Sequence, residues 1–290
     1  MFERMIVATD LSPASDAVVR CLGGLRAFGT EHGLLLQCLS YGDAASAAYA
    51  YDAHPHERLL AEQQAALERQ GFTVESRTVV GPPRREIVNT AVDERFGLIV
   101  VGAQGRSLVA EHLLGGIAYG IVSSASVPVL VMPVHRRSGE ENVCDVGRCD
   151  FRARVLFATD FSEASDRAFA VLEDLVARGA SAVTLVHVQD KVKLQHHLAH
   201  RLAEFDEIDR GRLEGLRDRL LRRGRPRVDV VIRHGVPHLE IAGLIQEHGA
   251  QLGVMGTQGR GFVGDLVLGS VSHNVVRRSA APVLLVPPAP

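Results

Sequence analysis

The sequence lacks the features that would place the protein in a membrane or on a nucleic acid. No apolar run approaches the roughly 20 residues that a membrane-spanning helix needs. The first residues, MFERMIVATD, lack the basic, apolar and small-residue segments of a signal peptide. The 32 lysines and arginines do not outnumber the 34 aspartates and glutamates, so no basic excess attracts nucleic acid or anionic lipid. These absences predict a cytoplasmic protein that binds neither membrane nor nucleic acid.

Cysteine is scarce as well. Of the four cysteines, Cys21 and Cys38 lie in apolar segments, which is typical of free, buried thiols in a reducing compartment. Cys144 and Cys149 have four residues between them in a polar stretch. We interpret these two as incidental thiols of a linker, and a redox or zinc role is the alternative.

Several familiar catalytic and metal motifs are missing. The glycine loops contain no Gly-Lys-Ser/Thr triplet, and Ala-Thr-Asp stands where a G-x-G-x-x-G would follow the first strand. His196, His197 and His200 form no H-E-x-x-H, so a polar helix face explains them better than a metal site. His187, inside an apolar run, is interpreted as a core histidine. No positioned base for water stands out, which favours a binding protein over an enzyme.

What the sequence does contain is an internal repeat. Its 290 residues suggest two domains, and the segments ATDLS and ATDFS begin at Ala8 and Ala158. Later matches, such as Gly81 with Gly235, are spaced wider by four residues, which indicates a net insertion in the second copy. The expected organisation is copy one at 1–134, a polar linker at 135–150 and copy two at 151–290.

Each copy alternates short apolar runs with amphipathic segments. The expected strands of copy two are 154–159, 182–188, 228–233, 252–256 and 283–286, and its expected helices are 165–178, 196–223, 239–248 and 270–278. This alternation favours a parallel sheet covered on both faces. We predict an α/β fold with two tandem doubly wound domains, each a five-stranded parallel sheet flanked by helices. Ligands of such sheets bind at the carboxyl ends of the strands.

Two strand ends of copy two carry residues suited to a nucleotide. Asp160 ends the first strand and could accept hydrogen bonds from a ribose or hold a metal ion. The fourth strand leads into the pattern Gly-x2-Gly-x9-Gly-Ser, whose glycines permit positive φ and a close approach of backbone amides to an anion. Ser270 stands at a helix N-cap position, a natural seat for phosphate. The candidate residues are Ala158, Thr159, Asp160, Met255, Gly256, Gly259, Arg260, Gly269, Ser270, Val271 and Ser272.

Each of these features also has a plainer interpretation. Asp160 alone is typical of a turn or capping residue, Gly-x-x-Gly of any loop, and Ser270 of a helix cap without a ligand. Arg260, and Arg106 in copy one, either reach phosphate or lie solvated beside the loop. A binding site is favoured because the features recur in both copies at the ends of adjacent strands.

Each half resembles a domain of the universal stress protein family. The resemblance rests on Ala158-Thr159-Asp160, on the complete Gly-x2-Gly-x9-Gly-Ser pattern and on the closing segment 281–286, APVLLV. It implies ATP, with Mg²⁺ or Mn²⁺, as the ligand: Asp160 on the ribose, Val188 at the end of the second strand on adenine, and the glycine loop on the phosphates. It also implies that the two copies pack as an intramolecular pseudo-dimer, with a homodimer of the chain as a further option.

Copy one departs from the family pattern. It keeps Asp10, Gly102, Gly105 and Gly115, but Gly116 replaces the serine, a lost hydroxyl worth about 1 kcal/mol at a cap. Its second strand leads into Tyr41-Gly42-Asp43 and an alanine-rich segment through Ala53. Weak nucleotide binding, another ligand and a structural role stay open for this copy.

The sequence therefore predicts an ATP-binding regulatory protein of the stress response, with the nucleotide mainly in copy two. Two alternatives remain: a slow ATP-hydrolysing enzyme that uses Asp160 with a metal, and a carrier of another small ligand that uses copy one.

Overall fold

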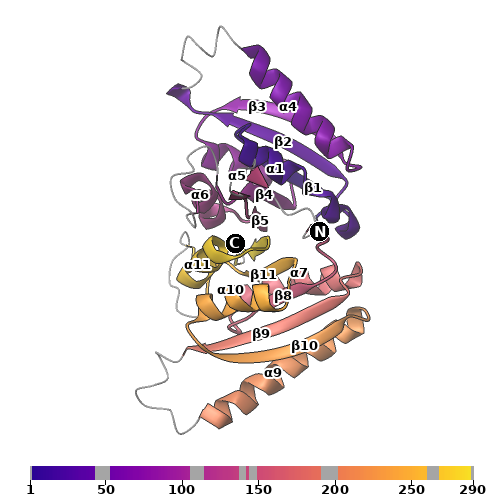
Figure 1. Cartoon of the computed structure of the whole chain (residues 1–290), viewed down its shortest axis with the longest axis vertical. Coiled ribbons are helices and arrows are strands. Elements are labelled where there is room, and N and C mark those ends of the chain that lie inside the picture. Colours follow the sequence, from indigo (N-terminus) through magenta and orange to yellow (C-terminus); the bar gives the residue numbers. More distant parts are fainter. Residues whose placement is uncertain are drawn as a thin grey trace. The chain divides into compact units, whose positions relative to one another are not determined.

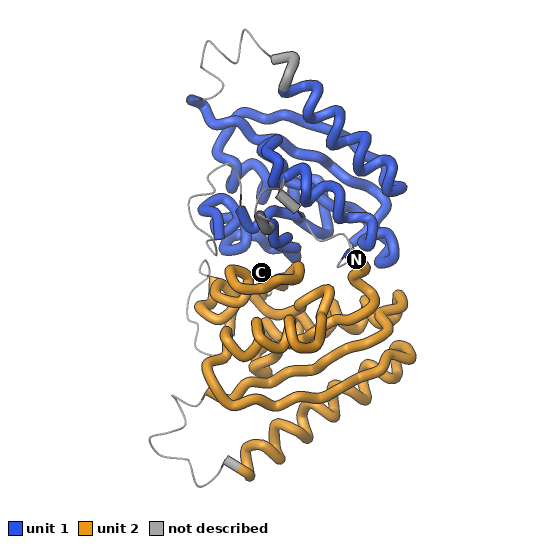
Figure 2. The backbone as a smooth tube through the Cα atoms, in the orientation of Figure 1, with its two compact units in different colours: residues 1–149 blue, residues 150–290 orange. Residues whose placement is uncertain are grey.

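The computed structural model describes residues 2–42, 53–104, 114–136, 142–143, 149–190, 202–259 and 268–288. The chain forms two compact units, Met1–Cys149 and Asp150–Pro290 (Figure 2). The division falls within the stretch 135–150 that we interpret as the linker. Each unit is described by itself.

Unit 1 is a five-stranded sheet with helices along both faces (Figure 1). The strands are parallel and lie in the order β3-β2-β1-β4-β5. Helices α1 and α4 cover one face, and α5 and α6 the other. The elements are β1 (Arg4–Thr9), α1 (Pro13–Val19), the 3₁₀ helix η1 (Gly23–Phe28), β2 (His32–Leu39), α4 (Ala53–Glu68), β3 (Thr73–Val80), α5 (Pro83–Asp93), β4 (Leu98–Gly102), α6 (Gly116–Ser124) and β5 (Val129–Met132), followed by the short antiparallel pair β6 (His135–Arg136) and β7 (Asn142–Val143).

Unit 2 repeats this arrangement. Its parallel strands follow the order β10-β9-β8-β11-β12, with α7 and α9 on one face and α10 and α11 on the other (Figure 1). The predicted α/β fold, with five parallel strands in each copy, is confirmed. The elements are β8 (Val155–Ala158), α7 (Glu163–Ala177), β9 (Ala182–Asp190), α9 (Leu202–Arg223), β10 (Arg227–Gly235), α10 (Pro237–Glu247), β11 (Leu252–Gly256), α11 (Ser270–Arg278) and β12 (Val283–Val286).

The central strands form the core of each sheet and fix where a ligand can bind. Every residue of β8 and β11 is buried, as expected for strands covered on both faces. The strand order reverses beside β8, which pairs with β9 on one side and β11 on the other. Sheets of this kind bind ligands where the strand order reverses, beyond the carboxyl ends of the two strands on either side, here β8 and β11. In unit 1 the same point lies between β1 and β4.

The first helix differs between the units. Helix α7 runs unbroken from Glu163 to Ala177, whereas unit 1 has α1 and then the separate 3₁₀ helix η1. The break falls at residues 20–22, and η1 then begins with Gly23 and Gly24; glycine is among the weakest formers of an α-helix interior.

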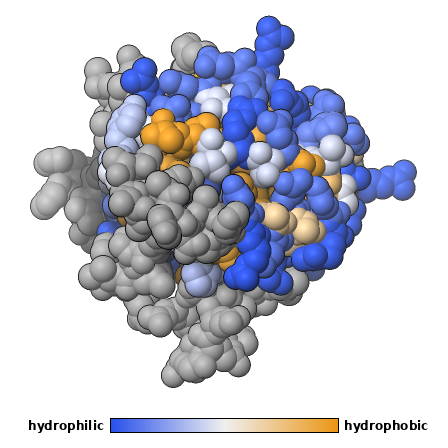
Figure 3. Space-filling model, turned by 90° about the horizontal axis from the view of Figure 1, so that it is seen from above, coloured by the Kyte–Doolittle hydropathy of each residue, from blue (hydrophilic) through white to orange (hydrophobic). Residues whose placement is uncertain are grey.

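Apolar side chains are scattered on the described surface. In the coloured part of the face shown in Figure 3, hydrophilic residues predominate and apolar groups lie between them, as is normal for a folded protein. Within the described ranges, none of the helices is long and apolar enough to cross a membrane.

Candidate functional site

The loop that follows the first strand of unit 2 is a tight, strained turn. The hydroxyl of Thr159 accepts a hydrogen bond from the Phe161 N–H (2.9 Å), and Oδ1 of Asp160 accepts one from the Ser162 N–H (3.1 Å). Phe161 adopts a φ of 57°, a left-handed conformation that costs a residue with a Cβ roughly 1–2 kcal/mol. Ser162 then caps α7 by accepting from the N–H of Ser165 (3.3 Å).

Unit 1 builds the same turn. Leu11 has a φ of 58°, and its N–H donates to the hydroxyl of Thr9 (3.0 Å) while Oδ1 of Asp10 accepts from the Ser12 N–H (3.1 Å). Strain of this kind persists only where its surroundings enforce it. The interpretation of Asp160 as a turn residue is confirmed by the hydrogen bond that its Oδ1 accepts from the Ser162 N–H.

The other carboxylate oxygen of Asp160 faces the glycine loop. A Cβ added to Gly259 would lie 2.6 Å from Oδ2 of Asp160. Gly256, at the end of β11, lies so close to α7 that its Cβ would meet the carbonyl carbon of Ala164 at 3.1 Å. The two strand ends that the sequence singles out therefore meet, and the missing side chains of the glycines allow it.

The sequence argument from positive φ is wrong for these glycines. Among the described glycines, positive φ occurs at Gly29, Gly71, Gly179 and Gly249, and none is found at Gly102, Gly115, Gly256, Gly259 or Gly269. Close approach is the reason for glycine here. A Cβ on Gly269 would lie 3.0 Å from the carbonyl oxygen of Thr257, which accepts a hydrogen bond from the Gly269 N–H (2.8 Å).

The prediction that Ser270 caps helix α11 is also wrong. Gly269 is the N-cap and Ser270 is the first helical residue, with no side-chain cap bond. The hydrogen bond from the Gly269 N–H to the Thr257 carbonyl goes with a helix that begins one residue earlier than the sequence suggests. Ser270 is exposed at the helix start, while the hydroxyl of the buried Ser272 donates to the carbonyl of Gly256 (2.9 Å). Ser272 thus ties α11 to the end of β11.

Unit 1 reproduces this helix start without the serine. Gly115 is the N-cap of α6, Gly116 is the first helical residue, and the Gly115 N–H donates to the carbonyl of Ala103 (2.8 Å). The two helix starts therefore share the same backbone hydrogen bond, and Gly116 lacks the hydroxyl of Ser270.

The adenine position predicted from the second strand needs one correction. Val188 does not end that strand, because β9 continues to Asp190, and Val188 pairs with Arg233 of β10. Its side chain is half-buried. Ala158 and Met255 are buried at the ends of β8 and β11, and Val271 is half-buried in the first turn of α11.

Several predicted residues lie outside the described residues. They are Asp43, Gly105, Arg106, Cys144, His196, His197, His200 and Arg260.

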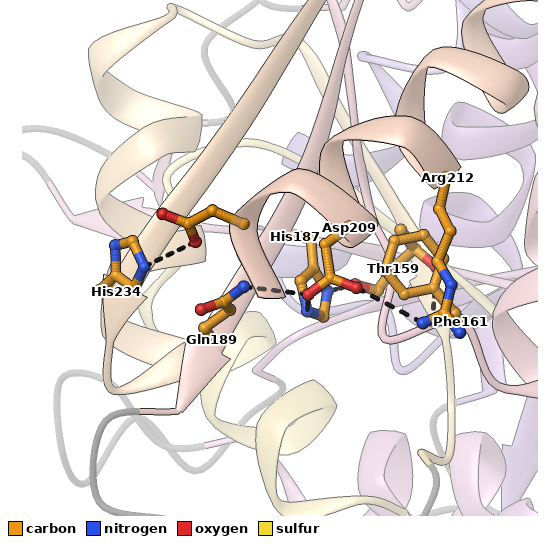
Figure 4. Close-up of polar contacts among 8 residues, drawn as sticks. Thr159, Phe161, His187, Gln189, Asp209, Arg212 and His234 are labelled. Carbon is orange, nitrogen blue, oxygen red and sulfur yellow. Dashed lines mark hydrogen bonds and ion pairs between the residues drawn. The ribbon is translucent and has the colours of Figure 1, made fainter. Parts of the chain in front are cut away.

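A polar network that the sequence did not predict adjoins the Asp160 turn (Figure 4). His187, on β9, is buried; its Nδ1 lies 2.8 Å from the Thr159 carbonyl oxygen and its Nε2 lies 3.4 Å from Oδ2 of Asp209 on α9. Gln189 donates to Oδ2 of Asp209 (3.0 Å), and Arg212 lies 3.4 Å from its Oδ1. The interpretation of His187 as a satisfied core histidine is confirmed, and the ring in addition joins α9 to the site.

Two other groups near the strand ends have shifted pKa values. Burial, and then the positive charge of Arg277, lower the pKa of His273 in α11, so this imidazole is neutral at pH 7. In β2, burial and then the charge of Glu86 raise the pKa of the Cys38 thiol to about 12. Cys21, Cys38 and Cys149 are free thiols, as expected for the first two, and the protonated Cys38 is a poor nucleophile.

Among the described residues, no group of three or more histidine, cysteine, aspartate or glutamate side chains could hold a metal ion.

Comparisons with known proteins agree on one family. The family model described as the universal stress protein family matches residues 1–133 and 152–287. A universal stress protein from Archaeoglobus fulgidus is 26% identical in sequence, each structure covers 99% of the other, and the TM-score is 0.72. Universal stress protein Rv2005c of Mycobacterium tuberculosis is 29% identical over 233 residues, which are 78% of this chain and 72% of that protein. A universal stress protein solved in complex with cAMP is 26% identical, with a TM-score of 0.36 over 46% of this chain and 97% of that one.

Proposed function

Because the chain belongs to the universal stress protein family, we propose that it binds ATP in copy two and acts as a cytoplasmic regulator of the stress response. The observation that supports this proposal is the close approach of Asp160 to the glycine loop. A Cβ on Gly259 would lie 2.6 Å from Oδ2 of Asp160, so glycine is required at this position. Nucleotide occupancy would change the surface that a partner meets.

Each group at these strand ends suits one part of the nucleotide. Oδ2 of Asp160 is placed to accept from ribose hydroxyls, and the open amides at the start of α11 suit an anion. The hydroxyl of Ser270 adds a donor beside those amides. Val188, on the neighbouring strand, is the proposed adenine contact. Mg²⁺ or Mn²⁺ would accompany the phosphates and neutralise their charge.

The first test asks whether the purified chain retains a nucleotide. Native mass spectrometry is expected to show ATP, ADP or AMP with the protein, and added ATP is expected to raise the melting temperature. If neither effect is seen, the proposal fails.

A second test assigns the site to copy two by exchanging Ser270 with its counterpart Gly116. Ser270→Gly should weaken ATP binding roughly three- to tenfold, the usual net value of one hydrogen bond. The reciprocal Gly116→Ser should strengthen binding to copy one, because a Cβ at Gly116 meets nothing within 4 Å. Calorimetric titration with ATP measures both. Gly259→Val should be more damaging still, and an equal loss from Gly105→Val would contradict the assignment.

A third test separates a binding protein from an enzyme. We expect bound ATP to persist without steady phosphate release. Release that vanishes in Asp160→Ala while ATP still binds would instead establish the slow hydrolase. The pseudo-dimer, the homodimer and the domain limits at 134 and 151 remain proposals, which the mass in solution and limited proteolysis test.

A further inference from the structure

A buried serine joins the first turn of α11 to the sheet of unit 2. The hydroxyl of Ser272 donates to the carbonyl oxygen of Gly256, the last residue of β11 (2.9 Å). One residue further along the chain, the carbonyl of Thr257 accepts from the N–H of Gly269, the N-cap of α11 (2.8 Å). Thr257 donates its own N–H to Val286 of β12 (2.9 Å). The start of α11 is therefore fixed to the sheet by two hydrogen bonds.

Gly256 is also in close contact with the helix that follows the Asp160 turn. A Cβ on Gly256 would lie 3.1 Å from the carbonyl carbon of Ala164 and 3.2 Å from its carbonyl oxygen. Ala164 lies in the first turn of α7, which Ser162 caps. The Asp160 turn and the first turn of α11 are thus held together through one residue, Gly256.

Copy one lacks the bond from the serine. Ala118 occupies in α6 the position of Ser272 in α11, and it is also buried but has no hydroxyl. The helix start is less close to the strand as well. A Cβ on Gly115 would lie 3.5 Å from the carbonyl oxygen of Ala103, against 3.0 Å at the matching position of copy two.

The strand end of copy one also meets its first helix differently. The atom of α1 nearest to a Cβ on Gly102 would be Cγ2 of Val18, at 3.5 Å. In copy two the nearest atoms belong to the backbone of α7. A side-chain methyl group moves when its rotamer changes, whereas a helix backbone does not. Copy two therefore has the more rigid connection between the two parts of its site.

We propose that Ser272 is a positioning residue of the nucleotide site in copy two. This inference rests on the proposed function. The bond from Ser272 to Gly256 holds the open amides of the first turn of α11 in place relative to Asp160 before the nucleotide binds. A turn that is already ordered loses less conformational entropy on binding, so the affinity for the nucleotide is higher.

Ser272 acts through the backbone and does not touch the nucleotide. Its hydroxyl has one hydrogen to donate, which the carbonyl of Gly256 accepts. Phosphate oxygens need donors, so this hydroxyl has nothing left to offer them. The exposed hydroxyl of Ser270 differs, because it would gain its partner only when the nucleotide is bound. The effect of Ser272 is therefore measurable without a ligand.

The first experiment is calorimetric titration of wild type and Ser272→Ala with ADP. The variant should bind ADP about three- to tenfold more weakly, the effect of one lost hydrogen bond of ordinary net strength. Ser279→Ala is the matched control. Ser279 is as buried as Ser272, its hydroxyl donates to the Ala281 carbonyl (2.7 Å), and it is the C-cap at the opposite end of α11. This variant should bind ADP as wild type does, and an equal loss would overturn the inference.

The second experiment measures amide hydrogen exchange without nucleotide. The N–H of His273 donates to the carbonyl of Gly269 (2.9 Å) and reports whether the first turn of α11 is closed. In Ser272→Ala this amide should exchange about three- to tenfold faster, because the same bond is lost. Weaker ADP binding with unchanged exchange would mean that the hydroxyl contacts the nucleotide directly, and the inference would be wrong.

The reciprocal variant tests the same bond in copy one. Ala118→Ser offers a hydroxyl to the carbonyl of Gly102, and the Tyr119 N–H, which donates to Gly115 (2.9 Å), should then exchange more slowly. Unchanged exchange at Tyr119 would count against the inference even if Ser272→Ala did not fold. A wild type that binds no ADP would refute the proposed function along with the inference. ADP binding of equal strength in wild type and Ser272→Ala would refute the inference alone.

Discussion

The long helices α4 and α9 occupy equivalent places on their sheets but are attached by different chemistry. Helix α4 uses uncharged amides: Oε1 of Gln63 accepts from the Thr9 hydroxyl (2.7 Å), and Gln64 donates to the Val74 carbonyl (3.2 Å). Helix α9 uses charges, as in the bond from Arg219 to the buried Glu173 (2.9 Å). It also takes part in two histidine–aspartate pairs, which are His187–Asp209 and His234–Asp206.

This difference shows that one fold can attach equivalent helices through different polar contacts. Gln63 links α4 to Thr9, and His187 links α9 to Thr159, so each helix is joined to the turn that presents the site aspartate. Helix α4 also has a histidine beside its sheet, because Nδ1 of His56 lies 3.5 Å from Nε2 of Gln37 on β2. What distinguishes the described contacts of α9 is therefore the carboxylates of Asp206, Asp209 and Glu173.

The largest expected effect comes from the buried leucine that each of the two helices places in its core. Leu67 on α4 and Leu213 on α9 are both fully buried, and replacing either by alanine should cost about 2–5 kcal/mol. Urea unfolding of Leu67→Ala and Leu213→Ala measures these costs. Similar values would show that apolar packing holds both helices and that polar contacts only tune them. A negligible loss for Leu213→Ala would mean that charge alone holds α9.

The sequence predicted the parts of this comparison that are local. The apolar runs gave the strands, so β11 at Leu252–Gly256 and α11 at Ser270–Arg278 match the expected limits. The repeat also placed Asp160 and the glycine loop at adjacent strand ends. The His187–Asp209 contact joins residues on separate elements, and no periodicity encodes it. The capping error at Ser270 has the same origin, because the distant carbonyl of Thr257 decides where α11 begins.

A smaller effect concerns the glycines that end the two helices. Gly71, after α4, has a φ of 90°, whereas Gly224, after α9, has ordinary angles but lies so close to Val176 that a Cβ would be 3.0 Å from its carbonyl oxygen. Alanine should cost about 1–2 kcal/mol at Gly71 through strain and about 1–3 kcal/mol at Gly224 through overpacking. Asparagine tolerates a left-handed backbone, so unfolding experiments should show rescue by Gly71→Asn and none by Gly224→Asn. Rescue at both sites would contradict this distinction.

Acid should weaken one ion pair of unit 1 by protonating its glutamate. Arg77 bonds to Glu94 (2.5 Å), and this bond lowers the pKa of the Glu94 carboxyl. A lowered pKa stabilises the fold above the ordinary glutamate value of about 4.3, and the effect is lost as the pH falls through the folded value. Because both side chains are about one-third exposed, the gain should be well under about 1 kcal/mol. Glu94→Gln should therefore melt slightly below wild type at neutral pH and together with it in acid. A difference in melting temperature between Glu94→Gln and wild type that grows on acidification would contradict this expectation.

The smallest expected effect compares the surface ion pairs of α4 and α9 with the buried ion pair of α9. Arg58–Glu62 on α4 (3.5 Å) and Arg217–Glu214 on α9 (2.9 Å) are surface pairs within one helix, and such pairs contribute about 0.3–0.5 kcal/mol. Arg58→Gln and Arg217→Gln should thus change the unfolding free energy equally little. Arg219→Gln should cost more, because Arg219 bonds to the buried Glu173 and lies over the ring of Phe169 at 4.6 Å. If Arg217→Gln proved as costly as Arg219→Gln, the stability of α9 would follow its overall charge. The contrast with α4 would then no longer depend on which charges face the sheet.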